Sequence, residues 1–168
     1  MNGNRLPVSI THYYNSCDSD KDEFGMGYGW RTSLHQTLHK VLYNGEVEFV
    51  YTDGDGTEHF FKKNEDDQKK YSDQSGLSLM LEVGDENVTI TDKGDNVMTF
   101  PLVSETPTED VPETEKVLIQ KIQDAVGSEV TVTALADSPL KIASVTDGAN
   151  RVTTLHYTDG RCDRIQTP

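Results

Sequence analysis

The clearest structural signal in the chain is the stretch Val145-Thr146-Asp147-Gly148-Ala149-Asn150-Arg151. An apolar residue and a threonine lead into an aspartate, and small residues follow it. An aspartate side chain can accept hydrogen bonds from backbone amides further along a turn, and glycine or asparagine tolerates the positive φ angle of a tight hairpin. The stretch therefore predicts a turn between two antiparallel strands.

The same order of residues, an apolar or aromatic residue, a polar residue and an aspartate, recurs along the chain. Each aspartate is followed within three residues by glycine, and the spacing of the two best internal copies is typical of repeat architectures. We therefore predict structural turns at Asp53, Asp92, Asp124, Asp147 and Asp159.

The segments between these turns alternate apolar and polar residues, as half-buried strands do. In residues 46–51, for example, Val47, Phe49 and Tyr51 share one face of a period-two strand. The pattern predicts an all-β fold, with antiparallel hairpins forming a curved continuous sheet or a small sandwich.

One segment, residues 112–126, fits two interpretations. A proline-rich acidic stretch precedes it, as before a helix start, but strand, turn and strand also fit. The repeat favours a turn at Asp124. We therefore predict an amino-terminal β segment (1–104), a proline-rich acidic linker (105–113) and repeat hairpins (114–168).

The charge of the chain excludes some classes of function. It has 29 acidic and 15 basic residues and a net charge of −14, a balance that repels nucleic-acid backbones and anionic lipid. No apolar run approaches the roughly 20 residues of a membrane-spanning helix, and residues 1–30 lack the apolar stretch of a signal peptide. We expect no nucleic-acid partner and no membrane insertion, and an exported chain is expected to be a segment of a longer protein.

Several of these stretches together resemble the Rhs/YD-repeat family. Residues Leu118 to Ile165 resemble its repeats, most closely at Val145 to Arg151 and at His156 to Arg161. Residues Leu6 to Ser16 resemble the strand that opens the segment before the repeats, and Phe24 to Trp30 the glycine-rich stretch that follows it. Only about two repeats follow the amino-terminal segment, so the chain resembles the front of a longer protein.

The resemblance implies a structural role outside the cell. In relatives a long β-strip spirals into a shell that encloses a carboxy-terminal toxin or effector. The implied function is a non-enzymatic segment of a secreted or cell-surface bacterial protein, without a cofactor. The implied partners are the rest of a longer chain or a second copy, through sheet edges. The alternative is a β module that binds carbohydrate or cell wall.

Candidate binding residues are few, and no arrangement of nucleophile and base indicates catalysis. Asp18, Asp20 and Asp22 alternate as in calcium loops but lack the other positions of an EF-hand; the default interpretation is a solvated acidic loop. Trp30 and Tyr28 are a candidate sugar platform, although aromatic residues at alternate strand positions usually pack in a core.

The spacing of the histidines and cysteines does not indicate a metal or redox site. His35 and His39 have a spacing that would let a helix present two zinc ligands, but the run reads as strand, so we expect them to face solvent. Cys17 and Cys162 lie near opposite ends of the chain, and either two free thiols or a single disulfide fits them.

Overall fold

The computed structural model describes residues 8–168 and is almost entirely β-structure. Leu6 and Pro7, which open the stretch compared with the Rhs family, lie outside the described residues. One turn of 3-10 helix, η1, spans Ser16–Asp18. In the part of the chain that is described, no helix has the length and apolar character needed to cross a bilayer.

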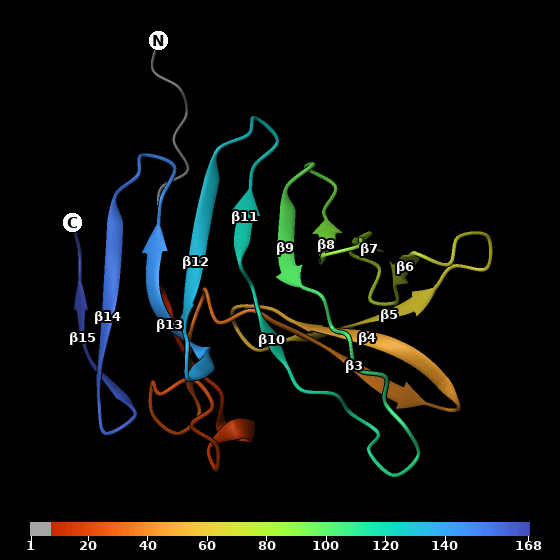
Figure 1. The fold of residues 1–168 in the computed structure, drawn as a ribbon, viewed down its shortest axis with the longest axis horizontal. Coiled ribbons are helices and arrows are strands. Elements are labelled where there is room, and N and C mark those ends of the chain that lie inside the picture. Colours follow the sequence, from red (N-terminus) through yellow and green to blue (C-terminus); the bar gives the residue numbers. More distant parts are fainter. Residues whose placement is uncertain (1–7) are drawn as a thin grey trace.

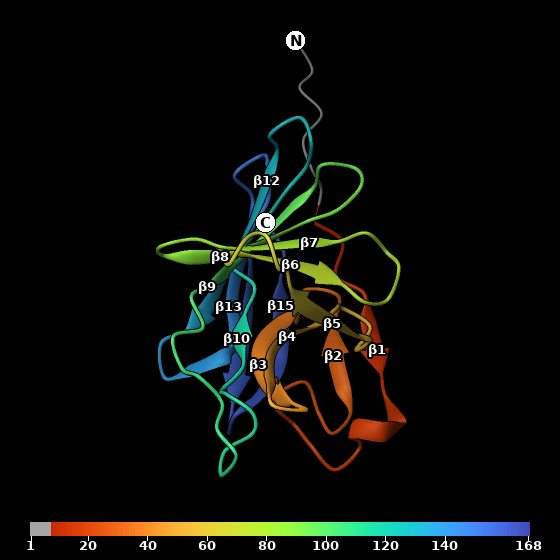
Figure 2. The ribbon, with the colours of Figure 1, turned by 90° about the vertical axis from the view of Figure 1, so that its right-hand side faces the viewer.

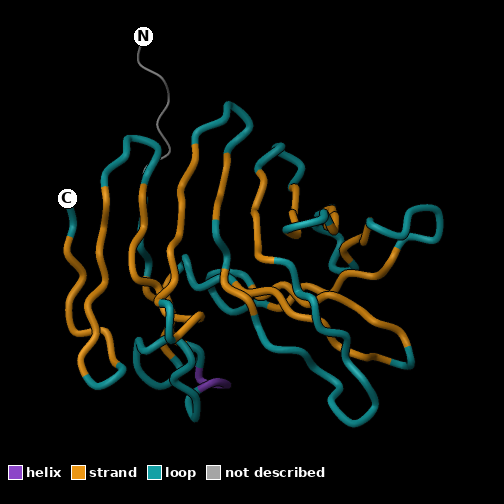
Figure 3. Tube along the Cα trace, viewed as in Figure 1, coloured by secondary structure: helices purple, strands orange, loops and turns teal. Residues whose placement is uncertain are grey.

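The strands are short, and successive strands are joined mainly by tight turns (Figure 3). They are β1 (His12–Tyr14), β2 (Trp30–Thr32), β3 (Thr37–Tyr43), β4 (Glu46–Thr52), β5 (Glu58–Lys63), β6 (Lys70–Asp73), β7 (Met80–Val83), β8 (Asn87–Thr91), β9 (Val97–Pro101), β10 (Val117–Leu118), β11 (Lys121–Gln123), β12 (Glu129–Leu135), β13 (Ser138–Thr146), β14 (Val152–Thr158) and β15 (Arg161–Gln166).

Thirteen of these strands form one antiparallel sheet, and β1 and β2 form a separate pair. The order in the large sheet is β10-β3-β4-β5-β6-β7-β8-β9-β11-β12-β13-β14-β15. Strands β11 to β15 stand side by side, whereas β3 and β4 lie across the other half of the molecule (Figure 1). The sheet is therefore continuous and curved, as the turn pattern predicts.

The segment from β10 to β11 joins the two ends of the β3–β9 run. Val117 and Leu118 pair with β3, whereas Lys121 to Gln123 pair with β9 on one side and β12 on the other. Between them, the amide of Ile119 donates to the carbonyl oxygen of Gln36. The sheet consequently curls back toward its first strand, and its strands change direction along the molecule (Figure 2). The strand and turn interpretation of residues 112–126 is confirmed.

The acidic stretch at residues 105–113 forms an extended loop on one side of this sheet. β9 before it and β11 after it pair directly with each other. The end of the loop runs along β3, where Glu113 bridges Val41 and the amide of Leu42 donates to the carbonyl oxygen of Pro112. The strands on either side of the acidic stretch thus belong to one sheet, and the end of the loop is bound to β3 by backbone contacts.

The core lies on the face of the sheet that the period-two pattern marks. Phe49 packs edge-on against Tyr71 at 4.9 Å, and Tyr51 packs edge-on against Phe100 at 5.8 Å. Aromatic pairs of this kind contribute about 0.5–1.5 kcal/mol beyond their burial. The fully buried members of this core include Leu38, Phe61, Leu81, Val88, Ile90, Ile119, Ile142 and Val145.

Candidate functional site

The turn at Asp53 shows in detail how the aspartates end one strand and start the next. Oδ1 of Asp53 accepts hydrogen bonds from the amides of Asp55 and Thr57, each at 3.1 Å. Its own amide donates to the carbonyl oxygen of Thr57, and the amide of Gly56 donates to the carbonyl oxygen of Asp53. Gly56 has a φ of 97°, a conformation that residues with a side chain rarely adopt. One carboxylate therefore satisfies two amides in a turn of fixed shape.

Three other predicted turns repeat this bonding. The third residue after each aspartate has a positive φ, which explains the glycine, asparagine or aspartate found there. Those residues are Gly127, Asn150 and Asp95. The aspartate Oδ1 accepts from the second and fourth amides: Gly94 and Asn96 at Asp92, Val126 and Ser128 at Asp124, and Ala149 and Arg151 at Asp147.

A further turn of this kind lies at Asp73, which the sequence analysis missed. The carboxylate of Asp73 accepts from the amides of Ser75 and Leu77, each at 2.8 Å, and Gly76 has a φ of 79°. The signal was present, because Tyr71, Ser72 and Asp73 follow the same order and a glycine comes within three residues.

The turn at Asp159 is of another type. Thr158 and Arg161 pair directly, which leaves a connection of two residues, Asp159 and Gly160, with φ angles of 50° and 78°. This is the conformation of a two-residue hairpin, in which aspartate and glycine are favoured for the positive φ itself. The expectation that Asp159 works as the other aspartates do is therefore corrected.

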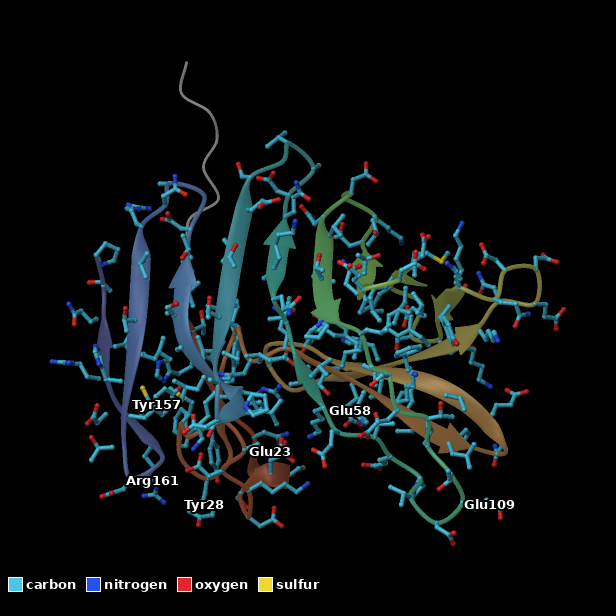
Figure 4. All side chains as sticks on the ribbon, in the orientation of Figure 1. Glu23, Tyr28, Glu58, Glu109, Tyr157 and Arg161 are labelled. Atoms are coloured by element: carbon cyan, nitrogen blue, oxygen red, sulfur yellow. The ribbon has the colours of Figure 1, made fainter. Side chains whose placement is uncertain are left out.

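The glycine-rich stretch before β2 lies against this same β14–β15 hairpin. The amide of Cys162 donates to the carbonyl oxygen of Gly25 at 2.6 Å. A side chain on Gly25 would meet the carbonyl oxygen of Gly160 at 2.6 Å, so only glycine allows this approach. Arg161 lies over the ring of Tyr28 at 5.4 Å (Figure 4).

The aromatic side chains near the amino terminus are exposed rather than packed in the core. Tyr14, Tyr28 and Trp30 are 55%, 55% and 44% exposed, and Tyr43 is exposed as well. The rings of Tyr14 and Trp30 lie 5.3 Å apart, tilted by 46°. The expectation of core packing is wrong for Trp30 and Tyr28 and holds for Tyr51. Tyr14 and Trp30 lie on the separate two-stranded β1–β2 pair, Tyr28 lies in the turn before β2, and Tyr43 is the last residue of β3.

The acidic run does not gather into a metal site. Asp18 accepts a hydrogen bond from the Asn15 side chain, and Asp22 accepts one from the amide of Gly27. Asp22 also lies 3.6 Å from Arg161, and Asp20 is exposed. Among residues 8–168, no group of three or more His, Cys, Asp or Glu side chains lies close enough to hold a metal ion. The calcium candidate is therefore not supported.

The histidines are buried, contrary to the expectation that they face solvent. His35 is fully buried and His39 is 4% exposed. Nδ1 of His35 accepts from the amide of Thr32, and its ring lies 4.6 Å from the ring of Phe24. Burial, with smaller contributions from Arg31, lowers the pKa of His35 to about 3. The ring of Phe24 lies against His35, and burial also lowers the pKa of His39.

The two cysteines, Cys17 and Cys162, are both free thiols. Cys17 is exposed in η1, and Cys162 lies half-buried at the start of β15, where burial raises its thiol pKa. A raised pKa keeps the less nucleophilic thiol form.

A family model described as a domain of unknown function (DUF6531) matches residues 1–61. The match covers part of the amino-terminal β segment, including β1 to β4 and most of β5. No curated protein matches the chain.

Proposed function

We propose that this chain is a structural, non-enzymatic segment of a longer secreted or cell-surface bacterial protein of the Rhs/YD-repeat type. It would form part of a β-shell around a carboxy-terminal toxin or effector. The observation that supports this is the repeated turn: Asp53, Asp73, Asp92, Asp124 and Asp147 make the same kind of backbone contacts within one continuous sheet.

The pairing of the strands in the sheet also supports this proposal. Each hairpin buries its apolar face only by packing against neighbouring hairpins, so each added hairpin stabilises the sheet. The segment from β10 to β11 curls the strip by binding both β3 and β9. The last strand in the order, β15, offers an edge at which a further strand of the same protein can pair.

The full-length product of the gene that encodes this chain provides the test. Limited proteolysis followed by mass spectrometry should leave this chain and the downstream strands as one protected particle, with the carboxy-terminal segment protected inside it. Release of this chain as an independent resistant domain, with the carboxy-terminal segment digested at the rate of a free control, would contradict the proposal.

A second candidate function is carbohydrate binding, which the exposed aromatic surface favours. The rings of Tyr14 and Trp30 lie 5.3 Å apart, tilted by 46°, and both side chains are exposed, as is that of Tyr28. Exposed aromatic rings present an apolar face to sugar C–H groups. Glycan-array binding that is lost in Trp30→Ala, with unchanged thermal unfolding, would support this function.

A further inference from the structure

Glu48 occupies an unusual position near the middle of the β3–β4–β5 sheet. It pairs with Val41 on β3, and continuing the Phe49–Phe61 pairing by one position places Lys62 beside it on β5. Its side chain is on the face opposite to Phe49 and the main core. A carboxylate here is surrounded by strands rather than by water.

The Glu48 side chain is buried without being fully satisfied. Glu48 is 3% exposed, and its Oε1 makes no hydrogen bond. The nearest cation, Nζ of Lys62, lies 3.5 Å from that oxygen in an ion pair, and the Lys62 side chain is 49% exposed. A buried acceptor without a hydrogen bond destabilises the fold by about 1–3 kcal/mol.

A cavity of about 380 Å³ opens above this carboxylate. It is lined by Tyr43, Glu48, Phe60, Lys62 and Gln74. Register places the two aromatic residues on opposite sides of Glu48, because Tyr43 pairs with Glu46 and Phe60 pairs with Val50. Tyr43 is 57% and Phe60 39% exposed, so both rings are available to a ligand. Cavities of this size hold small molecules.

We propose that this cavity binds one ring of a neutral sugar. The faces of the two aromatic rings carry partial negative charge and attract the C–H groups of a pyranose ring. A sugar hydroxyl can donate to Oε1 of Glu48 and accept from Nζ of Lys62, since the exposed lysine can move aside. The bond to the carboxylate is charge-assisted and is about twice as strong as a neutral one.

The charges of the site select against ionic ligands. A buried carboxylate on a chain of net charge −14 repels uronic acids and other anionic sugars. A cationic ligand would have to displace Lys62 from Glu48 and leave the lysine unpaired. A neutral polyol uses both members of the ion pair at once.

This site is separate from Trp30 and does not depend on the shell proposal. Tyr43, Glu48 and Phe60 belong to β3, β4 and β5, whereas Tyr14 and Trp30 belong to the β1–β2 pair. Sugar binding at the cavity would therefore stand if the chain were not part of a shell.

Titration of the 168-residue chain, followed by ¹⁵N–¹H NMR, tests the proposal. The neutral probes are cellotriose, chitotriose and maltotriose, the anionic probe is trigalacturonate, and the cationic probe is choline. We expect at least one neutral probe to shift the amides of β3, β4 and β5, with no shifts from trigalacturonate or choline. Tyr43→Ala and Phe60→Ala should each weaken binding by about tenfold.

The variant Glu48→Gln separates binding from folding. It keeps the shape of the side chain and removes the charge, so the fold should persist by circular dichroism while affinity falls about tenfold. Val126→Ala, at an exposed apolar residue outside both aromatic surfaces, is the control and should bind as the parent chain does. The proposal is overturned if no neutral probe shifts these strands, if choline or trigalacturonate binds there instead, or if Val126→Ala weakens binding as much as Tyr43→Ala does.

Discussion

The backbone amide of Cys162 donates to the carbonyl oxygen of Gly25 across 2.6 Å, and this bond joins the amino-terminal segment to the last strand of the sheet. The glycine-rich loop therefore occupies the first part of the outer edge of β15. Beside it, Asp22 lies 3.6 Å from Arg161, and Nζ of Lys141 donates to the carbonyl oxygen of Gly160. The contact links the part of the chain matched by the family model to the repeat-like hairpins.

Replacing Gly25 should break this contact. Gly25→Ala introduces a Cβ at a φ of 69°, 2.6 Å from the carbonyl oxygen of Gly160 and 3.0 Å from the ring of Tyr157. Gly45→Ala is the matched control, because Gly45 has a φ of 79° but nothing within 4 Å of the added atom. The control should lower the free energy of unfolding by about 1–2 kcal/mol. Gly25→Ala should lower it by about 1–3 kcal/mol more, through the clash. Equal losses in urea titrations would contradict the close approach.

The repeated turns should depend mainly on the carboxylate oxygen as an acceptor, with a smaller contribution from its charge. Asp124→Ala removes the acceptor for the amides of Val126 and Ser128 and should lower the free energy of unfolding by about 1–2 kcal/mol. Asp124→Asn keeps an oxygen in that place, so it should lower the free energy of unfolding clearly less than Asp124→Ala does. Chemical denaturation of both variants checks this, and equal destabilisation by the two would show that the oxygen is not what matters.

Stability should fall in acid as the turn aspartates take up protons. The Asn96 side chain holds the pKa of Asp92 below its ordinary value by donating to it, and the amide of Arg151 does the same for Asp147. A carboxyl group with a lowered folded-state pKa stabilises the fold above its unfolded-state pKa of about 4 and stops doing so as the pH falls through the folded value. Urea unfolding measured from pH 6 to pH 2.5 should show this loss. Asp92→Asn should reduce the loss, and an unchanged profile in that variant would contradict the assignment.

His35 should add a separate pH dependence. Its pKa of about 3 in the fold lies below the ordinary 6.5, so the unfolded chain binds the proton first. The unfolded state is then favoured progressively as the pH falls from 6.5 toward 3. His35→Asn, whose side-chain oxygen can still accept from the amide of Thr32, should flatten the stability profile between pH 6.5 and pH 4. His156→Asn, at a partly exposed position on β14, is the control, and equal flattening there would argue against His35.

The parts of this fold that local sequence predicts are those held by local bonds. The turn at Asp147 is formed by bonds to residues two and four positions later, so its residue order carries the whole signal. The alternation around Phe49 likewise marks the buried face of β4. Tyr71, Ser72 and Asp73 follow the same rule, so the turn at Asp73 was also predictable from its local sequence.

The parts that local sequence does not predict depend on contacts between distant segments. No feature of the local sequence predicts that Val117 and Leu118 pair with β3. Any strand of that length offers the same backbone groups for pairing. The sequence pattern predicts a buried Trp30 and an exposed His35, and the structure has the reverse. The exposure of each side chain depends on which other residues lie against it: Phe24 lies against the His35 ring, whereas Trp30 lies beside Tyr14, which is itself exposed.

The remaining edge of β15 should make the chain self-associate. The Gly25 contact occupies only the start of this edge, and β15 is last in the strand order, so no other described strand pairs beyond it. Exposed backbone groups at an edge pair readily with another strand. Light scattering coupled to size exclusion should therefore show a mass that rises with concentration.

A charge placed in the edge strand should weaken this association. Ile165→Lys changes β15 itself, whereas Val152→Lys changes an exposed apolar residue on the neighbouring inner strand β14 and serves as the control. Only Ile165→Lys should stay monomeric at concentrations where the parent chain associates, because a lysine on an edge strand opposes the pairing of a further strand. Equal loss in both variants would point to an apolar surface contact instead. A parent chain that stays strictly monomeric at high concentration would contradict the prediction of self-association.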